Sequence, residues 1–228
     1  MTGAELALHY PRLYHMAEDG AWPSIRAHGL LSTSALLRAH GLSGEAAAAL
    51  EGRRRPAGVR LAGPGLPDAV LRDQGPVSDA ALRRCLDDGL LPGDWYRMLN
   101  GRVFFWPSHA RLLRLLGARA YRGRPQTVLT LDTASLAEAH GAAMHLSAIN
   151  SGATIFGGPR RGIGTFVPLA AYPFAAWRAK RGLADAVVEV TVPDGVPDAV
   201  RHVLAVDRIA DGTATAIWRR EAADGPAA

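Results

Sequence analysis

Two residues of this chain place reactive groups in unusual settings, a histidine near the start and a glutamate near the end. His15 lies in the short segment from Leu13 to Met16, and Glu189 lies in the otherwise apolar run from Val187 to Val192. A strand alternates its faces with period two, so Glu189 points away from the alternate valines that fill a core. A carboxylate is rarely buried unless it is paired or used. The pattern predicts two strands that bring His15 and Glu189 together in a cleft.

Arg72 and a run of aromatic residues are further candidates for ligand contacts. Arg72 directly follows an apolar segment that resembles the end of a strand. Its guanidinium would clamp a phosphate or carboxylate, or form a salt-bridged strand end. Phe104, Phe105 and Trp106 are consecutive, so they cannot all face one side of a strand. Some of them must line a second surface, which is either another core layer or a stacking platform for a planar ring.

Several common kinds of site are not indicated. The histidines lack the HExxH spacing, and Cys85 is the only cysteine, so we expect neither a metal site nor an intrachain disulfide. The chain has no Walker phosphate loop, and its glycine pairs lack the strand–helix context of a dinucleotide-binding motif. It also has no Gly-x-Ser-x-Gly elbow, which argues against a serine hydrolase of that type.

Composition describes a globular chain with a basic surface. Of the 228 residues, 48% are hydrophobic and 21% are charged, which excludes wholesale disorder. The net charge of +5 comes almost entirely from arginine, because Lys180 is the only lysine. This charge is compatible with nucleic acid, with a phosphorylated cofactor, or with a solvated arginine-rich surface. No run of 18 apolar residues and no secretory signal is visible, so we expect a cytoplasmic protein with no membrane partner.

The order of expected elements predicts the α+β class, with helices between several short strands. Pro23 suits the first turn of a helix that ends at Gly29. The glycines, prolines and arginines from Gly52 to Pro67 indicate an exposed loop. We expect a single domain over residues 1–218 and a flexible C-terminal tail over residues 219–228. The strands that we expect are residues 13–15, 102–106, 127–131, 187–192 and 203–209.

Two segments resemble the DarT family of NAD-dependent DNA ADP-ribosyltransferases. The first is Leu13-Tyr14-His15-Met16 with the following Trp22-Pro23-Ser24-Ile25 and His28-Gly29-Leu30-Leu31, although Ala21-Trp22 stands where the family has Asn-Leu. The second is the segment from Val188 to Pro197, which is similar to the family's stretch around its catalytic glutamate. Arg72 falls where that family carries an arginine of its active site, and the segment from Val103 to Pro107 resembles the family's aromatic strand that leads to a proline.

The resemblance implies a function, a co-substrate and roles for individual residues. It implies a split mixed β-sheet core with flanking helices, which binds NAD without a Rossmann unit. Glu189 and Arg72 would be catalytic, and ADP-ribose would pass to an acceptor, most simply a base of DNA or RNA, in a toxin or defence enzyme. The NAD-binding residues that the resemblance implies are His15, Arg72, Phe105 and Trp106.

The acceptor and its contacts are less constrained by the resemblance. The segment from Asn150 to Phe166 has no counterpart in the family, and such enzymes vary there to contact their targets. Asn150, Arg160 and Arg161 are therefore the expected acceptor-binding residues. An antitoxin is a further partner to test for. The alternatives are ADP-ribosylation of a protein or small molecule, hydrolysis of NAD, and a non-catalytic module that binds nucleotide or nucleic acid.

Overall fold

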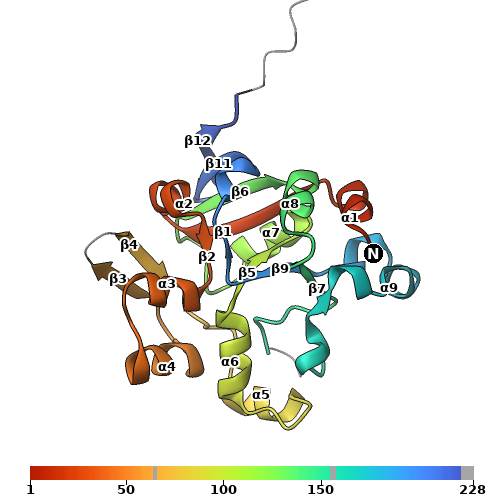
Figure 1. Ribbon diagram of the computed structural model, residues 1–228, viewed down its shortest axis with the longest axis horizontal. Helices are drawn as coiled ribbons and strands as arrows, with labels where there is room; N and C mark the ends of the chain where they lie inside the picture. The colour runs from red at the N-terminus through yellow and green to blue at the C-terminus, as the bar shows by residue number, and fades with distance from the viewer. Residues whose placement is uncertain (64–65, 155–157, 222–228) are drawn as a thin grey trace, which may run out of the picture.

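The computed structural model describes residues 1–63, 66–154 and 158–221 and shows an α+β fold (Figure 1). Its framework is two four-stranded sheets, in the orders β1-β6-β11-β12 and β5-β9-β7-β8. Every pairing between these strands is antiparallel, so the α+β prediction is confirmed but the prediction of a mixed sheet is wrong.

The first sheet carries His15 and is built from long strands with apolar inner faces. Its strands are β1 (Arg12–Glu18), β6 (Gln126–Asp132), β11 (Val203–Ala210) and β12 (Thr213–Arg219). His15 is opposite Leu129, which in turn is opposite Val206 of β11. Leu129 and Val206 are fully buried, so the central strand fixes the register of both neighbours.

The second sheet carries Glu189 on a central strand. Its strands are β5 (Arg102–Phe105), β7 (His145–Ser147), β8 (Val167–Pro168) and β9 (Glu189–Pro193). Glu189 is opposite Ser147 of β7, and Val190 is opposite Phe105 of β5. Because β9 has a neighbour on each side and both its faces are covered, Glu189 is only 4% exposed.

The two sheets meet where β1 passes the end of β5. Tyr14 and Trp106 form an antiparallel bridge, in which the Tyr14 N–H donates to the Trp106 carbonyl at 3.0 Å and the Trp106 N–H donates back at 2.8 Å. Strand β5 therefore lies between β1 and β9. This order separates the backbones of His15 and Glu189 by two strand spacings, roughly 10 Å. A single hydrophobic cluster with members on both sheets fills the space around them.

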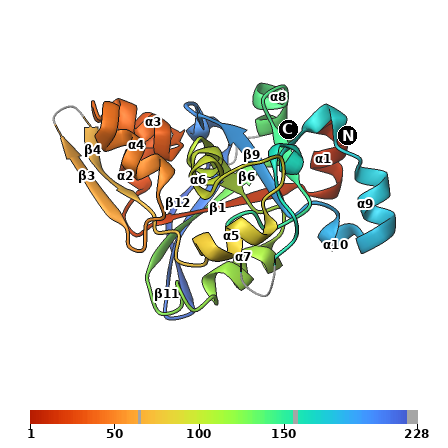
Figure 2. The same ribbon diagram turned by 90° about the horizontal axis from the view of Figure 1, so that it is seen from below.

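Short helices and two small ribbons surround this framework. In Figures 1 and 2, α3, α4, β3 and β4 gather at the opposite side of the molecule from α1 and α9. The ribbons are β2 (Leu30–Leu31) with β10 (Gly195–Val196), and β3 (Val59–Gly63) with β4 (Leu66–Leu71). The helices are α1 (Gly3–His9), α2 (Trp22–His28), α3 (Thr33–Ala39), α4 (Gly44–Gly52), α5 (Asp79–Cys85), α6 (Pro92–Asn100), α7 (His109–Leu116), α8 (Thr133–His140), α9 (Phe174–Arg181) and α10 (Leu183–Ala186), with the 3₁₀ turns η1 (Ile163–Thr165), η2 (Leu169–Ala171) and η3 (Ala199–Arg201).

Gly29 is the end of α2 that the sequence predicts, and its conformation explains the residue type. Its φ is +78°, and an added Cβ would lie 2.4 Å from the Val196 carbonyl oxygen. The glycine thus lets the chain turn directly into β2, which pairs with β10 just beyond β9.

The expected exposed loop from Gly52 to Pro67 is confirmed only in part, because most of its described residues are exposed but its second half forms a strand. Gly52 ends α4, and β3 and β4 form an antiparallel hairpin. Arg55 is buried, and its guanidinium donates to the Leu50 carbonyl at 2.6 Å and to Asn100 Oδ1 at 2.8 Å. The composition, which is rich in arginine and glycine, did not indicate that the Arg55 side chain makes hydrogen bonds inside the protein.

Residue 219, where we expect a flexible tail to begin, belongs to a strand in the structure. Arg219 is the last residue of β12, and the Arg220 N–H donates to the Leu204 carbonyl at 2.9 Å. The chain is therefore attached to the first sheet through Arg220, because β12 pairs with β11 along its length. The remainder of the predicted tail, residues 222–228, lies outside the described residues.

No described helix has the length and apolar character that crossing a membrane requires.

Candidate functional site

A cleft of about 890 Å³ opens beside the junction of the two sheets. Its wall contains residues from both sheets, from the β3–β4 hairpin and from the turn after β7. This volume is in the range of small-molecule sites. Most of the predicted site residues line it: His15, Arg72, Trp106, Asn150 and Glu189. The structure thus brings together the histidine, the arginine and the carboxylate, which are far apart in the sequence.

His15 presents one ring nitrogen to this cleft as an acceptor. Its Nδ1 lies 2.9 Å from the Phe104 carbonyl oxygen. A carbonyl can only accept, so Nδ1 carries the proton and the neutral ring keeps its lone pair on Nε2. Burial lowers the pKa of His15 to about 4, and the positive charge of Arg72 acts in the same direction. The ring is therefore neutral at physiological pH and suited to accept a hydrogen bond from a hydroxyl group.

Glu189 is a buried carboxyl with one unpartnered oxygen. Its Oε1 accepts the Ser151 backbone N–H at 3.1 Å, whereas Oε2 has no partner among the described residues. Burial raises the pKa of Glu189 to about 7, although Ser151 and the positive charges of Arg161 and Arg111 act in the opposite direction. A carboxyl with such a pKa, lining a cleft, is a typical candidate for acid–base or charge-stabilising chemistry.

Further hydrogen bonds hold the turn at Ser151, which donates to Glu189. The Ser151 carbonyl accepts Arg161 Nη1 at 3.0 Å and Trp95 Nε1 at 3.3 Å. Arg161 Nη1 also donates to the Ala153 carbonyl at 3.1 Å. Since the same peptide segment donates to Glu189, Arg161 and Trp95 determine where the carboxyl lies.

Arg72 has a free donor on the cleft, at the strand end where the sequence places it. It follows the last residue of β4, and its Nη1 donates to the Met16 carbonyl at 3.2 Å. Its guanidinium lies over the Tyr121 ring, 5.0 Å from the centroid. Nη2 is buried with no partner among the described residues. An arginine that is fixed on one side and free on the other is well suited to bind an anionic oxygen.

The aromatic run divides between the cleft and the core. Trp106 lines the cleft as expected, and Phe104 joins it. Phe105 is fully buried in the main hydrophobic cluster and does not line the cleft, which leaves it no surface on which a ligand ring could stack. Strand alternation explains the division, because Phe104 and Trp106 are two residues apart and Phe105 lies between them.

The three expected acceptor-binding residues have different positions. Asn150 is exposed at the cleft wall. Arg160 is exposed, pairs with Asp87, and does not line the cleft. Arg161 is 1% exposed and binds backbone carbonyls, so it supports the site and does not offer its charge to a ligand. Residues 155–157 of the same segment lie outside the described residues.

Sequence reasoning missed Ser151, Arg102 and Arg111. Ser151 occupies an Asn-Ser-Gly turn, and only the tertiary structure shows that its N–H meets Glu189. Arg102 lines the cleft, two of its buried nitrogens have no partner among the residues that the structure describes, and its guanidinium lies 4.5 Å from the Phe166 ring centroid. Arg111 also lines the cleft, and it pairs with Asp185. The only sequence signal for the two arginines was the general abundance of arginine, and the only one for Ser151 was its place in a turn.

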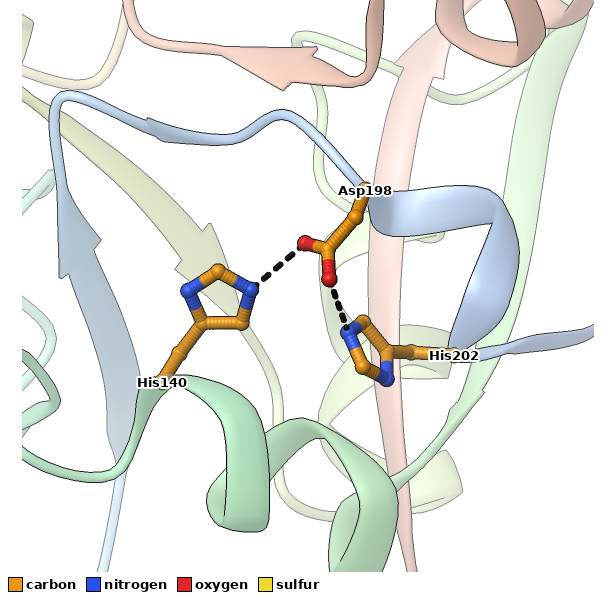
Figure 3. A group of neighbouring side chains, drawn as sticks. All are labelled: His140, Asp198 and His202. Carbon is orange, nitrogen blue, oxygen red and sulfur yellow. Dashed lines mark hydrogen bonds and ion pairs between the residues drawn. The ribbon is translucent and has the colours of Figure 1, made fainter.

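A second polar cluster lies apart from the cleft. His140, Asp198 and His202 place three ligand atoms within 4.8 Å of one another, and none of these residues lines the cleft (Figure 3). The sequence predicted no metal site, because His140 and His202 are 62 positions apart and show no ligand spacing. Within the described residues this is the group whose side chains suit a metal ion.

Comparison with known proteins places the chain in a family but gives it no activity. No curated protein matches it. The model of a family of unknown function (DUF7002) matches residues 11–203, a span that includes His15, Arg72 and Glu189. Because this match covers most of the chain, the protein belongs to the DUF7002 family of unknown function.

Proposed function

We propose that this protein is an NAD-dependent ADP-ribosyltransferase. The observation that carries the proposal is the buried Glu189 carboxyl, which lines a cleft together with His15 and Arg72 and has one oxygen without a partner among residues 1–63, 66–154 and 158–221. Two sheets joined through the Tyr14–Trp106 bridge, with a cleft beside the junction, support a split-sheet arrangement, although these sheets are antiparallel and not mixed as the resemblance implies.

The cleft offers a distinct partner for each part of NAD. The acceptor Nε2 of His15 suits a ribose hydroxyl, and the free Nη2 of Arg72 suits the pyrophosphate. Phe104 or Trp106 would stack on the nicotinamide ring, in place of the core residue Phe105. Within the described part of the chain, six of the residues with buried unpartnered polar atoms line this cleft, which is the distribution expected of groups that await a ligand: His40, Arg72, Arg102, Arg111, Ser151 and Glu189.

Glu189 would act on the bond between nicotinamide and ribose. This bond breaks with its electron pair leaving on nicotinamide, and the ribose passes through a transition state with oxocarbenium character. A negative carboxylate beside the ribose stabilises that positive charge. A nucleophilic nitrogen or oxygen of the acceptor then bonds to the anomeric carbon and loses its proton to the carboxylate. Ser151 keeps one carboxylate oxygen in place while the other acts.

The acceptor that we propose is a base of DNA or RNA. The chain carries a net charge of +5, and Arg102, Arg111 and Arg114 line the cleft. Cationic side chains around a reactive site favour a polyanionic acceptor over a neutral small molecule. An activity of this kind would suit a toxin or defence enzyme.

Incubation with labelled NAD and separate pools of DNA, RNA and protein tests the proposal directly. We expect label in a nucleic acid pool with the wild type and its loss with Glu189→Gln. Label in the protein pool would overturn the choice of acceptor, and release of nicotinamide without labelled product would indicate hydrolysis. Intact NAD in every pool would overturn the proposed reaction and leave a binding module.

A further inference from the structure

We propose that His140, Asp198 and His202 form a binding site for one Zn²⁺ ion. His140 is the last residue of α8, whereas Asp198 and His202 flank the 3₁₀ turn η3 just before β11. Figure 3 shows both imidazole rings directed toward the Asp198 carboxylate. Two imidazoles and one carboxylate are a common ligand set for zinc, with water in the fourth position.

The distances within the cluster are close to those of a coordinated ion. His140 Nε2 lies 2.6 Å from Asp198 Oδ1, and His202 Nε2 lies 3.3 Å from Asp198 Oδ2. Zinc bonds of 2.0–2.2 Å at tetrahedral angles place neighbouring ligand atoms about 3.4 Å apart. The two contacts end on different oxygens of Asp198, and the three ligand atoms lie within 4.8 Å of one another, so small side-chain movements would bring them to this separation around one ion.

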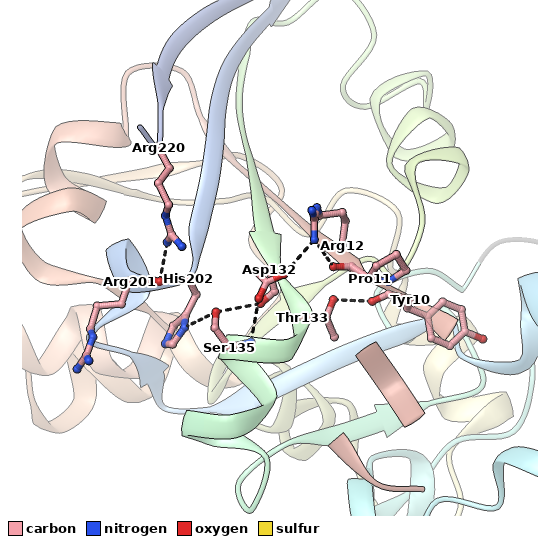
Figure 4. Close-up of polar contacts among 9 residues, drawn as sticks. All are labelled: Tyr10, Pro11, Arg12, Asp132, Thr133, Ser135, Arg201, His202 and Arg220. Atoms are coloured by element: carbon pink, nitrogen blue, oxygen red, sulfur yellow. Dashed lines mark hydrogen bonds and ion pairs between the residues drawn. The ribbon is translucent and has the colours of Figure 1, made fainter. Parts of the chain in front are cut away.

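The ring nitrogen of His202 that points away from the cluster, Nδ1, has a hydrogen-bond partner, as is usual for histidines that bind zinc. This nitrogen lies 3.0 Å from Ser135 Oγ (Figure 4). When the ring donates this proton to Ser135, the lone pair is left on Nε2, which faces the cluster. The His202 carbonyl also accepts the Asp132 N–H at 2.8 Å, so both the backbone and the ring are fixed.

The scaffold around the three ligands is rigid. Leu136 and Ala137 lie one turn before His140, Ala199 follows Asp198, and Val203 follows His202; all four are buried in the main hydrophobic cluster. His202 is 4% exposed, whereas the side chains of His140 and Asp198 keep exposures of 19% and 31%. An ion could therefore enter from solvent on the side of His140 and Asp198, into a site whose backbone is held by the core and whose side chains need only small movements.

Zinc is favoured over the hard cations by the ligand atoms. Mg²⁺ and Ca²⁺ prefer oxygen ligands, and this cluster supplies two nitrogens and one carboxylate. The bound ion would join the end of α8 to the turn that leads into β11. Because none of the three residues lines the cleft, this role is separate from the proposed transferase reaction.

Titration of the metal-free full chain with Zn²⁺ by isothermal calorimetry tests the site. We expect one ion per chain, no comparable binding of Mg²⁺, and a higher unfolding temperature with zinc. His140→Gln is the main variant because this residue is partly exposed, and it should weaken zinc binding at least tenfold. Ser135→Ala keeps all three ligands and should weaken binding by about tenfold through loss of the orienting hydrogen bond.

His109→Gln is the matched control, because His109 is exposed and lies outside the cluster. It should bind zinc as the wild type does. Absence of zinc binding by the folded wild type would overturn the proposal and leave a hydrogen-bonded His–Asp–His cluster. Undiminished binding in His140→Gln would equally overturn it, because the ion would then occupy another site.

Discussion

The backbone N–H of Ser151 donates to Oε1 of Glu189 at 3.1 Å, and the buried Oε2 has no partner in the part of the chain that the structure describes. One hydrogen bond from the main chain orients the carboxyl, yet it does not offset the cost of burial, since the pKa of Glu189 is raised to about 7. The carboxyl is thus kept in a single orientation and close to its titration point at neutral pH. This combination is useful for a group that stabilises developing positive charge and then accepts a proton.

Glu189→Gln should lower NAD cleavage and transfer by about 10²–10⁴-fold, because the amide keeps the shape but supplies neither negative charge nor a base. Steady-state release of nicotinamide, with and without nucleic acid, measures the effect. Glu45→Gln is the matched control, because Glu45 is exposed on α4 and does not line the cleft. Equal activity of the wild type and Glu189→Gln would rule out the catalytic role.

The rate should depend on the ionisation of Glu189. If the carboxylate is the active form, kcat/KM for NAD rises with pH through about 7 and is level above it. His15 has a pKa of about 4, so it contributes no step near neutrality. A profile recorded between about pH 5 and 9 checks this expectation. A profile that falls with rising pH through 7 would mean that the protonated acid is the active form.

The ionisation of Glu189 should lower the stability of the protein over the same pH range in which it raises the rate. Because the pKa of Glu189 is about 7 in the folded chain against an ordinary 4.5, the folded state binds more protons between these values. The wild type therefore loses stability as pH rises from 4.5 to 7, by roughly 3 kcal/mol in total. Glu189→Gln lacks this loss.

The comparison of the two proteins isolates Glu189 from the other groups. His15 makes both proteins less stable as pH falls from 6.5 toward 4, because its pKa is lowered in the folded state, and this contribution cancels in the difference. Urea denaturation at several pH values should show that the free energy of unfolding of Glu189→Gln increases relative to that of the wild type as pH rises. A difference that does not vary with pH would mean that Glu189 titrates normally.

Arg72→Ala should raise KM for NAD at least tenfold, because the unpartnered Nη2 would no longer meet the pyrophosphate. Arg72→Lys should recover part of the loss, since it restores the charge without the planar fork. Arg53→Ala is the control, as Arg53 is exposed and does not line the cleft. If Arg72→Ala changed only the unfolding temperature, the contact with Met16 would be its whole role.

Period-two alternation was enough to predict that His15 and Glu189 lie on strands of one site. The structure confirms that both line the cleft. The local sequence pattern could not show which of Phe104 and Phe105 lines the cleft. Other elements pack on both faces of β5, and their positions decide it. The pattern also could not show that Arg55 alone among the neighbouring arginines is buried, since one of its acceptors, Asn100 Oδ1, comes from a distant part of the chain.

Arg160 and Arg161 form a natural pair for separating surface from buried arginines. Arg161→Ala should destabilise the protein by about 2–4 kcal/mol, because it removes charge-assisted hydrogen bonds to buried carbonyls of Ser151 and Ala153. Arg160→Ala should leave the stability almost unchanged, because the pairing of Arg160 with Asp87 is exposed to solvent. The midpoints of urea denaturation, compared between variants whose m-values are equal, measure the change in stability of both variants. Similar losses in the two variants would mean that Arg161 does not support the Ser151 turn, and the position of Glu189 would then need another explanation.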